Sequence, residues 1–316
     1  MLFRSVVPIG IPDNVWTKFD IKENLITSEM VSKMLPKRKP DGHKGDFGKL
    51  FILAGSTGLT GAATLAAEAS ARAGLGLVTV GCPQTINPIL ENKLTEPMTY
   101  PLPDVGKKGF LAKRGLGGIR KKMAENDAVI IGPGIGTHYE TRELVQKLVS
   151  EIDKPTIIDA DGLNAFAKNR EALSGEHSKL VLTPHPGEFG RLIDEEIPSD
   201  LTDKYNLVRK YAKKYNSVIV LKGSPTIIVD IDGQLFLNPT GNNGMATGGT
   251  GDVLSGMIGS FLAQGLSPIN SAIVGVYIHG LCGDLAVDEY GERSLLAGDL
   301  IYFLPDAFSI LETAVI

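Results

Sequence analysis

The sequence contains few cysteines, no excess of basic residues and no long uninterrupted hydrophobic segment. Its two cysteines, Cys82 and Cys282, lie far apart in the 316-residue chain, which excludes a disulfide framework or a Cys-based metal site and fits a reducing compartment. The 32 Lys and Arg residues are outnumbered by 36 Asp and Glu, so no basic excess exists to drive non-specific nucleic-acid binding. The most apolar stretch near the start, Val6–Ile11, contains Pro8 and Gly10 and is too short for a signal core or a membrane span. We therefore expect a cytoplasmic protein with no nucleic-acid or membrane partner.

Glycine is the residue that the sequence has in excess. It contains 37 glycines, above the usual share of about 7%, whereas its 43% hydrophobic and 22% charged residues are typical of a globular protein. Glycine allows the backbone to approach a ligand closely or to adopt a positive φ, so the excess indicates binding loops or tight turns. The length suggests one large α/β domain or two small ones.

Short apolar runs alternate with helical segments along most of the chain. The predicted strands are Leu50–Ala54, Leu77–Val80, Ala128–Ile131, Thr156–Ile158, Leu180–Leu182 and Val218–Leu221. The predicted helices include Thr60–Ala73, Thr141–Ser150, Leu201–Lys214 and most of the chain after Gly251, and Ile227–Val229 with Gln234–Leu237 is predicted as a hairpin. This alternation predicts a mostly parallel sheet with helices on both faces. Such sheets bind ligands at the carboxyl ends of their strands, so the residues that directly follow strands are the candidates for function.

Two glycine-rich segments follow predicted strands. The segment Gly55–Ala63 connects a strand to a helix, yet it has neither the P-loop spacing nor the G-x-G-x-x-G spacing of dinucleotide-binding turns. The segment Ile131–Gly136 combines three glycines with Pro133. Either segment alone is equally consistent with a ligand contact and with a tight turn.

Polar residues follow three other strands. Asp159-Ala160-Asp161 suits magnesium-bound water or hydroxyl contacts, although we expect Asp161 to cap a helix and leave Asn164 as a candidate ligand contact. In Thr183–Glu188 two prolines hold His185 stiffly after a strand, which favours a substrate contact over a structural role; one His and one Glu are too few for a zinc site. Lys222–Thr226 could place a cation and amides around phosphate oxygens, or be a hairpin turn with an exposed lysine.

The strongest signal is the glycine-rich segment Asn238–Gly256. It ends where an apolar helical pattern begins, so Gly248–Gly251 is expected to form a cradle of free amides at a helix N-terminus. Such a cradle stabilises negative charge on a transferring phosphoryl group. Asp252 lies at its mouth and is the candidate general base, because a merely dipole-favoured Asp does not need Gly-Gly-Thr-Gly before it.

Taken in order, these motifs resemble a known family. The chain resembles the ribokinase-like fold, a three-layer α/β/α arrangement, and within it the ADP- or ATP-dependent NAD(P)H-hydrate dehydratases. The resemblance begins at about Lys44. The matching segments are His43–Gly48, Ala54–Ser56, Gly61–Ala63, Arg72–Val78, Ile131–Gly134, Thr183–Glu188, Lys222–Thr226, Asn238–Gly241 and Gly248–Asp252.

This resemblance implies a reaction and a set of contacts. ADP, or ATP in eukaryotic relatives, would phosphorylate the ring hydroxyl of the S form of hydrated NADH or NADPH; phosphate would then leave and restore the reduced nicotinamide. Asp252 would be the base, and the expected contacts with the hydrated dinucleotide are Ala62, Gly134, His185, Asp252 and Asn164. The expected contacts with the adenine nucleotide are Lys222, Gly223, Ser224, Pro225, Thr226, Gly248, Gly249, Thr250 and Gly251. Phosphoryl transfer also implies Mg²⁺, for which no dedicated cage of ligands is visible.

The resemblance also bears on domain organisation and partners. We expect residues 1–43 to be a leader, with Lys37–Gly45 as a surface linker, and residues 44–316 to be the catalytic domain. The segment Val6–Pro12 resembles the end of an epimerase domain, which would make an NAD(P)H-hydrate epimerase a functional partner. Relatives suggest a homotetramer. The main alternative function is a ribokinase-like kinase of a vitamin-precursor alcohol, and a nucleotide sensor without catalysis is a weaker one, because Asp252 and the cradle are intact.

Overall fold

The computed structural model describes residues 21–38, 40–173 and 179–313, together with residues 10, 12 and 15. Its centre is a ten-stranded sheet in the order β1-β10-β9-β8-β7-β6-β5-β2-β3-β4, in which β9 alone among the described strands runs antiparallel to its neighbours. The strands are β1 (Glu23–Leu25), β2 (Lys49–Leu53), β3 (Leu77–Pro83), β4 (Met98–Leu102), β5 (Ala128–Ile131), β6 (Thr156–Ile158), β7 (Leu180–Leu182), β8 (Val218–Leu221), β9 (Thr226–Val229) and β10 (Leu235–Asn238). The prediction of a mostly parallel sheet is confirmed.

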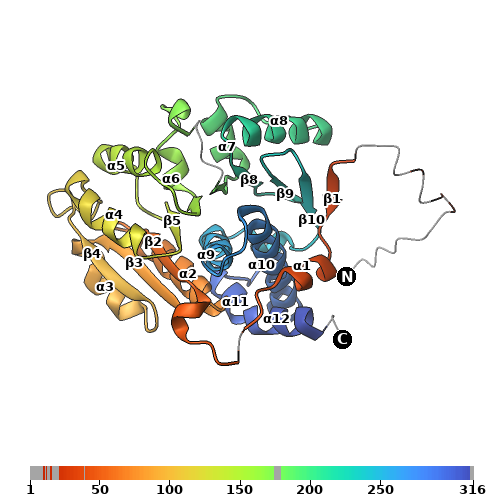
Figure 1. Ribbon diagram of the computed structural model, residues 1–316, viewed down its shortest axis with the longest axis horizontal. Helices are drawn as coiled ribbons and strands as arrows, with labels where there is room; N and C mark the ends of the chain where they lie inside the picture. The colour runs from red at the N-terminus through yellow and green to blue at the C-terminus, as the bar shows by residue number, and fades with distance from the viewer. Residues whose placement is uncertain are drawn as a thin grey trace.

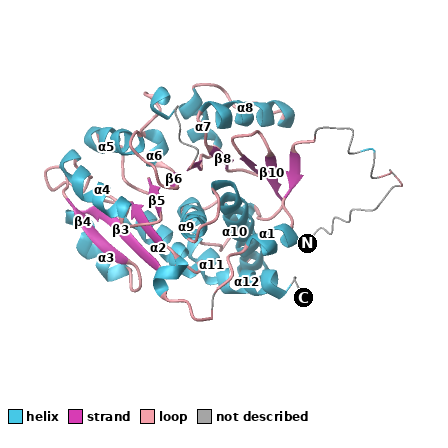
Figure 2. Cartoon of the chain, in the orientation of Figure 1, coloured by secondary structure: helices cyan, strands magenta, loops and turns pink. Residues whose placement is uncertain are grey.

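Helices cover both faces of this sheet, and Figures 1 and 2 show the strands running between two sets of helices. The helices are α1 (Ser28–Met34), α2 (Thr60–Arg72), α3 (Asn87–Lys93), α4 (Leu116–Ala124), α5 (Tyr139–Val149), α6 (Asp161–Asn164), α7 (Pro186–Ile193), α8 (Leu201–Lys214), α9 (Thr250–Ala263), α10 (Pro268–Tyr290), α11 (Ala297–Tyr302) and α12 (Leu304–Thr313). The core is divided accordingly. One cluster packs the sheet against α2 and α9–α12, and the other packs it against α4, α5, α7 and α8. The fold is therefore the expected three-layer α/β/α arrangement.

The pattern of β2 shows why these strands appear as continuous apolar runs in the sequence. Leu50 and Ile52 belong to one core cluster, and Phe51 and Leu53 belong to the other. Successive side chains of a strand point to opposite faces, so a strand that is buried on both faces must be apolar at every position.

The packed unit begins before the boundary expected at residue 44. Strand β1 pairs in parallel with β10, and helix α1 packs against α10 and α12. Ile26 and Val31 are fully buried in the core. Residues 21–34 are thus part of the fold rather than a leader, because they cover the edge of the sheet. Most of Val6–Pro12, the segment similar to the end of an epimerase, lies outside the described residues.

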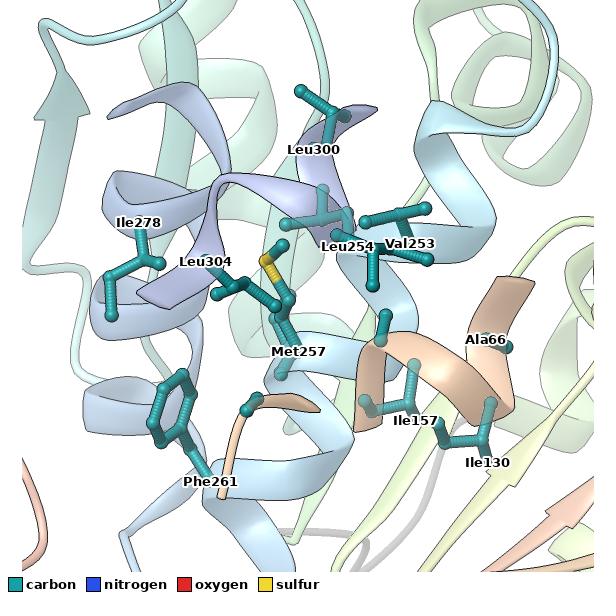
Figure 3. Packing of buried hydrophobic residues seen from close by; sticks show 14 of the residues in the cluster. Ala66, Ile130, Ile157, Val253, Leu254, Met257, Phe261, Ile278, Leu300 and Leu304 are labelled. Atoms are coloured by element: carbon teal, nitrogen blue, oxygen red, sulfur yellow. The ribbon is translucent and has the colours of Figure 1, made fainter. Parts of the chain in front are cut away.

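Helix α9 is the centre of the larger core cluster. All of its residues from Val253 to Ala263 are buried, and Figure 3 shows side chains from the sheet, α2, α10, α11 and α12 meeting around it. Helix α2 lies very close to α9, because a Cβ placed at Gly256 would be only 2.3 Å from the carbonyl oxygen of Ala66. The Ser70 hydroxyl also donates to the Gly256 carbonyl at 3.0 Å. Small residues at this crossing hold the two helices in direct backbone contact.

Helix α10 is long and apolar enough, by length and composition, to cross a membrane. In the structure most of its residues are buried against α9, α11, α12 and the sheet. Its apolar character is therefore accounted for by packing in the core.

Candidate active site

The segments predicted to carry function meet at the carboxyl edge of the sheet, after β2, β5, β6, β7 and β8. Backbone hydrogen bonds connect neighbouring segments: the Gly55 amide donates to the Pro133 carbonyl at 2.9 Å, and the Lys222 amide donates to the Pro184 carbonyl at 2.9 Å. The Asp159 amide donates to the Ile131 carbonyl at 3.1 Å. The convergence follows from topology, since parallel strands end on the same side of their sheet.

The N-terminus of α9 forms the predicted cradle. Gly249 caps the helix with φ of 96°, a left-handed conformation that favours glycine, and no side chain caps this end. Thr250 fixes the turn, because its hydroxyl donates to the carbonyls of Met245 and Thr247, both at 3.1 Å. The amides of Gly251 and Asp252 have no hydrogen-bond partner among the described residues. They are available to an anion, as the amides of a first helical turn are in many phosphate sites.

Asp252 lies in this first turn, partly buried and surrounded by other carboxylates. Burial raises its pKa to about 7, and the nearby carboxylates of Asp159, Asp161 and Glu188 act in the same direction while the Lys222 ammonium opposes them. A carboxyl group that exchanges its proton near neutral pH is well suited to general-base catalysis.

Lys222 is not the exposed lysine of an ordinary hairpin turn. Its Nζ lies 3.1 Å from Asp159 Oδ1 and 3.7 Å from Glu188 Oε2. Burial lowers the pKa of Lys222, but Asp159 and Glu188 outweigh it, so the pKa is raised and the side chain stays charged. A Cβ placed at Gly251 would lie 3.4 Å from this ammonium, which shows that the cation sits beside the free amides.

Asp159 connects three elements at the site. It is 1% exposed, and besides Lys222 it accepts hydrogen bonds from the hydroxyls of Thr183 at 2.8 Å and Ser255 at 2.7 Å. It thereby joins the end of β6 to β7, β8 and α9. The sequence placed Asp159 after a buried strand but gave no sign of these partners, since Ser255 is 96 residues away. The sequence analysis named Asp159 for magnesium-bound water or hydroxyl contacts but not for its bond to Lys222, and it missed Ser255 altogether.

His185 is the N-cap of α7. Its amide donates to Glu188 Oε2 at 2.8 Å, and its Nδ1 accepts a hydrogen bond from the Gly187 amide at 3.0 Å. In the neutral ring the proton is therefore on Nε2, on a side chain that is 51% exposed. Because Glu188 is also near Lys222, the His185 ring and the cation belong to one cluster.

The structure corrects the role expected for Asp161. The N-cap of α6 is Ala160, and the Asp161 carboxylate instead accepts from the Gly136 amide at 2.9 Å and from Asn164 Nδ2 at 3.3 Å. The side-chain oxygen of Asn164, Oδ1, in turn accepts a hydrogen bond from Arg191 Nη2 at 3.2 Å. Asn164 is therefore held at both ends of its amide. The carboxylate fixes the end of the second glycine-rich loop at Gly136, and the Ser56 hydroxyl, which donates to the Gly134 carbonyl at 2.8 Å, fixes its middle.

The remaining predicted residues fall into two groups. Ala62 and Gly134 are neighbours, since a Cβ placed at Gly134 would lie 3.0 Å from the Ala62 Cβ. The turn Gly223–Pro225 connects β8 to β9, contains a cis Ser224–Pro225 peptide bond, and is closed by the Thr226 hydroxyl, which donates to the Gly223 carbonyl at 3.0 Å. No group of three His, Cys, Asp or Glu side chains that could hold a metal ion occurs among the described residues.

Comparison with known proteins now places the chain in a family. A family model described as NAD(P)H-hydrate dehydratase matches residues 50–306. The chain belongs to the NAD(P)H-hydrate dehydratase family. This assignment agrees with the resemblance found in the motifs, which lie within or next to the matched residues.

Relatives in this family are similar over most of the chain. It is 43% identical over 98% of its length to the bifunctional NAD(P)H-hydrate repair enzyme Nnr of Moorella thermoacetica, and covers 58% of that protein. It is 34% identical over 90% of its length to the ADP-dependent (S)-NAD(P)H-hydrate dehydratase of Bacillus subtilis, and covers 98% of it. The chain thus spans little more than half the length of the bifunctional relatives, but nearly all of this dehydratase.

Solved structures confirm the fold. A crystal structure of the ADP/ATP-dependent NAD(P)H-hydrate dehydratase of Bacillus subtilis, co-crystallised with ATP and Mg²⁺, has a TM-score of 0.76 and 34% identity, with 92% of this chain and 99% of that one covered. A ribokinase-like superfamily protein of Enterococcus faecalis has a TM-score of 0.79 and 27% identity over 93% of this chain and 98% of that one. The ribokinase-like fold expected from the motifs is therefore confirmed.

Proposed function

We propose that this member of the NAD(P)H-hydrate dehydratase family restores NADH or NADPH from the S form of its hydrate, at the expense of ADP or ATP. The observation that carries the proposal is the position of Asp252, whose pKa is raised to about 7, next to the free amide of Gly251 and the ammonium of Lys222. The site thus combines a proton acceptor with two kinds of donor for phosphate oxygens. The names of the relatives in Moorella and Bacillus supply the substrate class.

The first step is phosphoryl transfer. Asp252 takes the proton of the ring hydroxyl while the hydroxyl oxygen forms a bond to the terminal phosphorus of ADP. The bond from that phosphorus to the bridging oxygen breaks and AMP is released. The amides of Gly251 and Asp252 and the Lys222 ammonium stabilise the charge on the phosphoryl oxygens. Asp159 would hold Lys222 in place through the bond from its Nζ, because the Asp159 carboxylate is itself held by the hydroxyls of Thr183 and Ser255.

The second step is elimination. The phosphate ester breaks at its carbon–oxygen bond, and the neighbouring ring carbon loses a proton, which leaves with the departing phosphate as HPO₄²⁻, so that the reduced nicotinamide forms again. Hydroxide is a poor leaving group and phosphate a good one, which is the chemical reason for the first step. The net reaction converts the hydrate and ADP into the reduced cofactor, AMP, phosphate and one proton, the proton that Asp252 took from the hydroxyl and then releases.

The proposed contacts follow from where the two groups of residues lie. Ala62, Gly134, His185 and Asn164 would contact the hydrated dinucleotide, with Asp252 at its hydroxyl. The turn Lys222–Thr226 and the segment Gly248–Gly251 would contact the adenine nucleotide. Ala62 lies on α2 and Gly251 on α9, two helices in direct contact, so the acceptor and donor sides of the reaction would be held next to each other.

The residues of the site fit a magnesium ion that is carried largely by the phosphates of the nucleotide. Four carboxylates, of Asp159, Asp161, Glu188 and Asp252, surround the single ammonium of Lys222, and this negative excess attracts a cation. Because the described residues contain no cluster of three ligands, Asp161, Glu188 and Asp252 would hold the ion through its water shell. When bound, Mg²⁺ neutralises charge on the transferring phosphoryl group.

The direct test is to incubate the protein with hydrated NADH, Mg²⁺ and either ADP or ATP, and to follow the absorbance of the reduced nicotinamide. We expect recovery that depends on nucleotide. No recovery with either nucleotide, for NADH hydrate and NADPH hydrate alike, would exclude the proposal. Accumulation of a stable phosphorylated vitamin-precursor alcohol would indicate the alternative kinase instead.

Two partners belong to the proposal. An NAD(P)H-hydrate epimerase would supply the S form, and its addition is expected to complete the repair of a mixture of both epimers. The second partner is the chain itself: four copies would form a homotetramer. Light scattering on the protein in solution would then give four times the mass of one chain.

A further inference from the structure

The side chain of His279, on α10, contacts the first turn of α9, where the cradle lies. Its Nε2 lies 2.8 Å from the carbonyl oxygen of Thr250, the first residue of α9. A carbonyl oxygen only accepts hydrogen bonds, so Nε2 carries the proton and donates it. The geometry fixes the tautomer of this ring.

The ring makes this bond as a neutral group. The pKa of His279 is lowered to about 4, chiefly by burial and also by the positive charge of Lys222, while the hydrogen bond to Thr250 acts in the opposite direction. Near neutral pH the imidazole is therefore an uncharged donor.

The carbonyl that it holds belongs to the same peptide group as the free amide of Gly251. In a trans peptide the C=O and N–H bonds point in opposite directions. When the Thr250 oxygen is fixed to α10, the Gly251 N–H points away from α10, on the side where the amide has no protein partner. A donor on the carbonyl also polarises the peptide, so that its N–H becomes a stronger donor.

The same helix holds the loop that leads into the cradle. The Thr240 hydroxyl donates to the Tyr277 carbonyl at 2.9 Å, and Asp284 Oδ2 accepts from the Gly241 amide at 3.0 Å. His279 lies between these two anchors on α10 and fixes the far end of the loop. The residues from Thr240 to Thr250 are thus positioned by one helix.

We infer that His279 is a positioning residue for phosphoryl transfer: through the Thr250–Gly251 peptide it aims and strengthens the Gly251 amide that binds the transferred phosphoryl group. The inference rests on the proposed function for the identity of that group. It predicts that His279 acts on the terminal phosphate of the nucleotide and has no effect on the binding of the adenosine part.

The test compares His279→Phe, which fills the space without a donor, with His279→Gln, whose Nε2 reaches a similar distance. The affinity of the protein for ADP and for AMP is measured by calorimetry. The ratio of the two affinities gives the contribution of the terminal phosphate to binding, because the two nucleotides differ only in that group. In His279→Phe we expect the ratio to fall about tenfold and kcat to fall roughly 10- to 100-fold. His279→Gln should restore both to within a few-fold of the wild type.

Tyr277→Phe is the matched control, since it removes a polar group from a buried ring two residues away on the same helix and keeps the backbone carbonyl that accepts from Thr240. It should leave the ADP/AMP ratio and kcat unchanged. A folded His279→Phe variant with the wild-type ratio and kcat would overturn the inference. If that variant does not fold, His279→Asn, which is too short to reach Thr250, makes the same comparison: a lowered ratio supports the inference and an unchanged ratio refutes it.

The affinity ratio also separates this inference from the proposed function. A wild-type protein that binds ADP more tightly than AMP but does not restore hydrated NADH or NADPH would refute the proposed function alone. The effect of His279 on the ratio would still be measured in that case.

Discussion

Replacing Asp252 with Asn is expected to abolish activity and at the same time to stabilise the protein above neutral pH. Burial raises the pKa of Asp252 from 3.8 to about 7. The folded state thus retains a proton that the unfolded state has already released between these two pH values. Stability is lost as the pH rises through this range and stays low above it. Below about pH 4 the carboxyl group is protonated in both states and has no such effect.

The magnitude follows from the shift. One pKa unit corresponds to about 1.36 kcal/mol, so the ionised carboxylate lowers the free energy of unfolding by up to about 4 kcal/mol at pH 8. Asn is close to Asp in shape and uncharged at every pH. The attraction between Asp252 and Lys222, which Asn would lose, is already included in the net shift of this pKa.

The assay is urea denaturation, followed by circular dichroism between pH 4.5 and 8, of the wild type, Asp252→Asn and Asp232→Asn. Asp232 lies exposed in the turn between β9 and β10, and this control should behave like the wild type. We expect Asp252→Asn to gain stability over the wild type as the pH rises, and to lose roughly 10²- to 10⁴-fold in kcat. In the wild type, kcat/KM should fall tenfold per pH unit below about pH 7. An Asp252→Asn protein that is no more stable than the wild type at pH 8 would refute the reasoning.

Three further outcomes are expected. Lys222→Met leaves a buried carboxylate without its cation and should lower the free energy of unfolding by about 3 kcal/mol and weaken ADP binding, whereas Lys210→Met, at a solvent-exposed ion pair, should have little effect on stability; equal losses in urea titrations would contradict the assignment. Gly249→Ala forces a side chain into φ of 96° and within 2.5 Å of Leu65, and should lower the melting temperature and ADP affinity, while Gly298→Ala, with open space around it, should change neither. Removing Mg²⁺ with EDTA should stop turnover and leave the melting temperature of the nucleotide-free protein unchanged; turnover that persists would exclude the ion from the reaction.

The strands that the sequence predicts best are those buried on both faces. Ala128–Ile131 and Val218–Leu221 match β5 and β8 at both ends. A short run that is apolar at every position, bounded by glycine or polar residues, is typical of a strand that is buried on both faces of the sheet. Strand β1 was not predicted, since three residues with exposed Glu23 and Leu25 carry no apolar pattern. Strand β4 was also missed, because it lies at the sheet edge and contains Pro101.

In the candidate site, too, some features could be predicted from neighbouring residues in the sequence and others could not. Local signals predicted Asp252 and the glycine turn, because the helix start and the glycines are adjacent in the chain. The partners of Asp159 were not predictable, since Thr183, Lys222 and Ser255 come from three other elements and their approach depends on the sheet order. The role of Asp161 was missed for the same reason: its carboxylate does not cap the N-terminus of α6 but binds the Gly136 amide, 25 residues earlier in the chain, as well as the side chain of Asn164.

The contact between α2 and α9 limits how this protein can adapt to its ligands. With the carbonyl of Ala66 against Gly256 and the Ser70 hydroxyl bonded to the Gly256 carbonyl, the crossing has no room for a larger side chain and the two helices are joined directly. The span from Ala62 to Asp252 is set by this crossing before any ligand arrives. Binding of a larger or smaller acceptor molecule must then come from changes in the surface turns that face α2 and α9. Substitutions that widen the substrate range should therefore occur in those turns and not at the contact between the two helices.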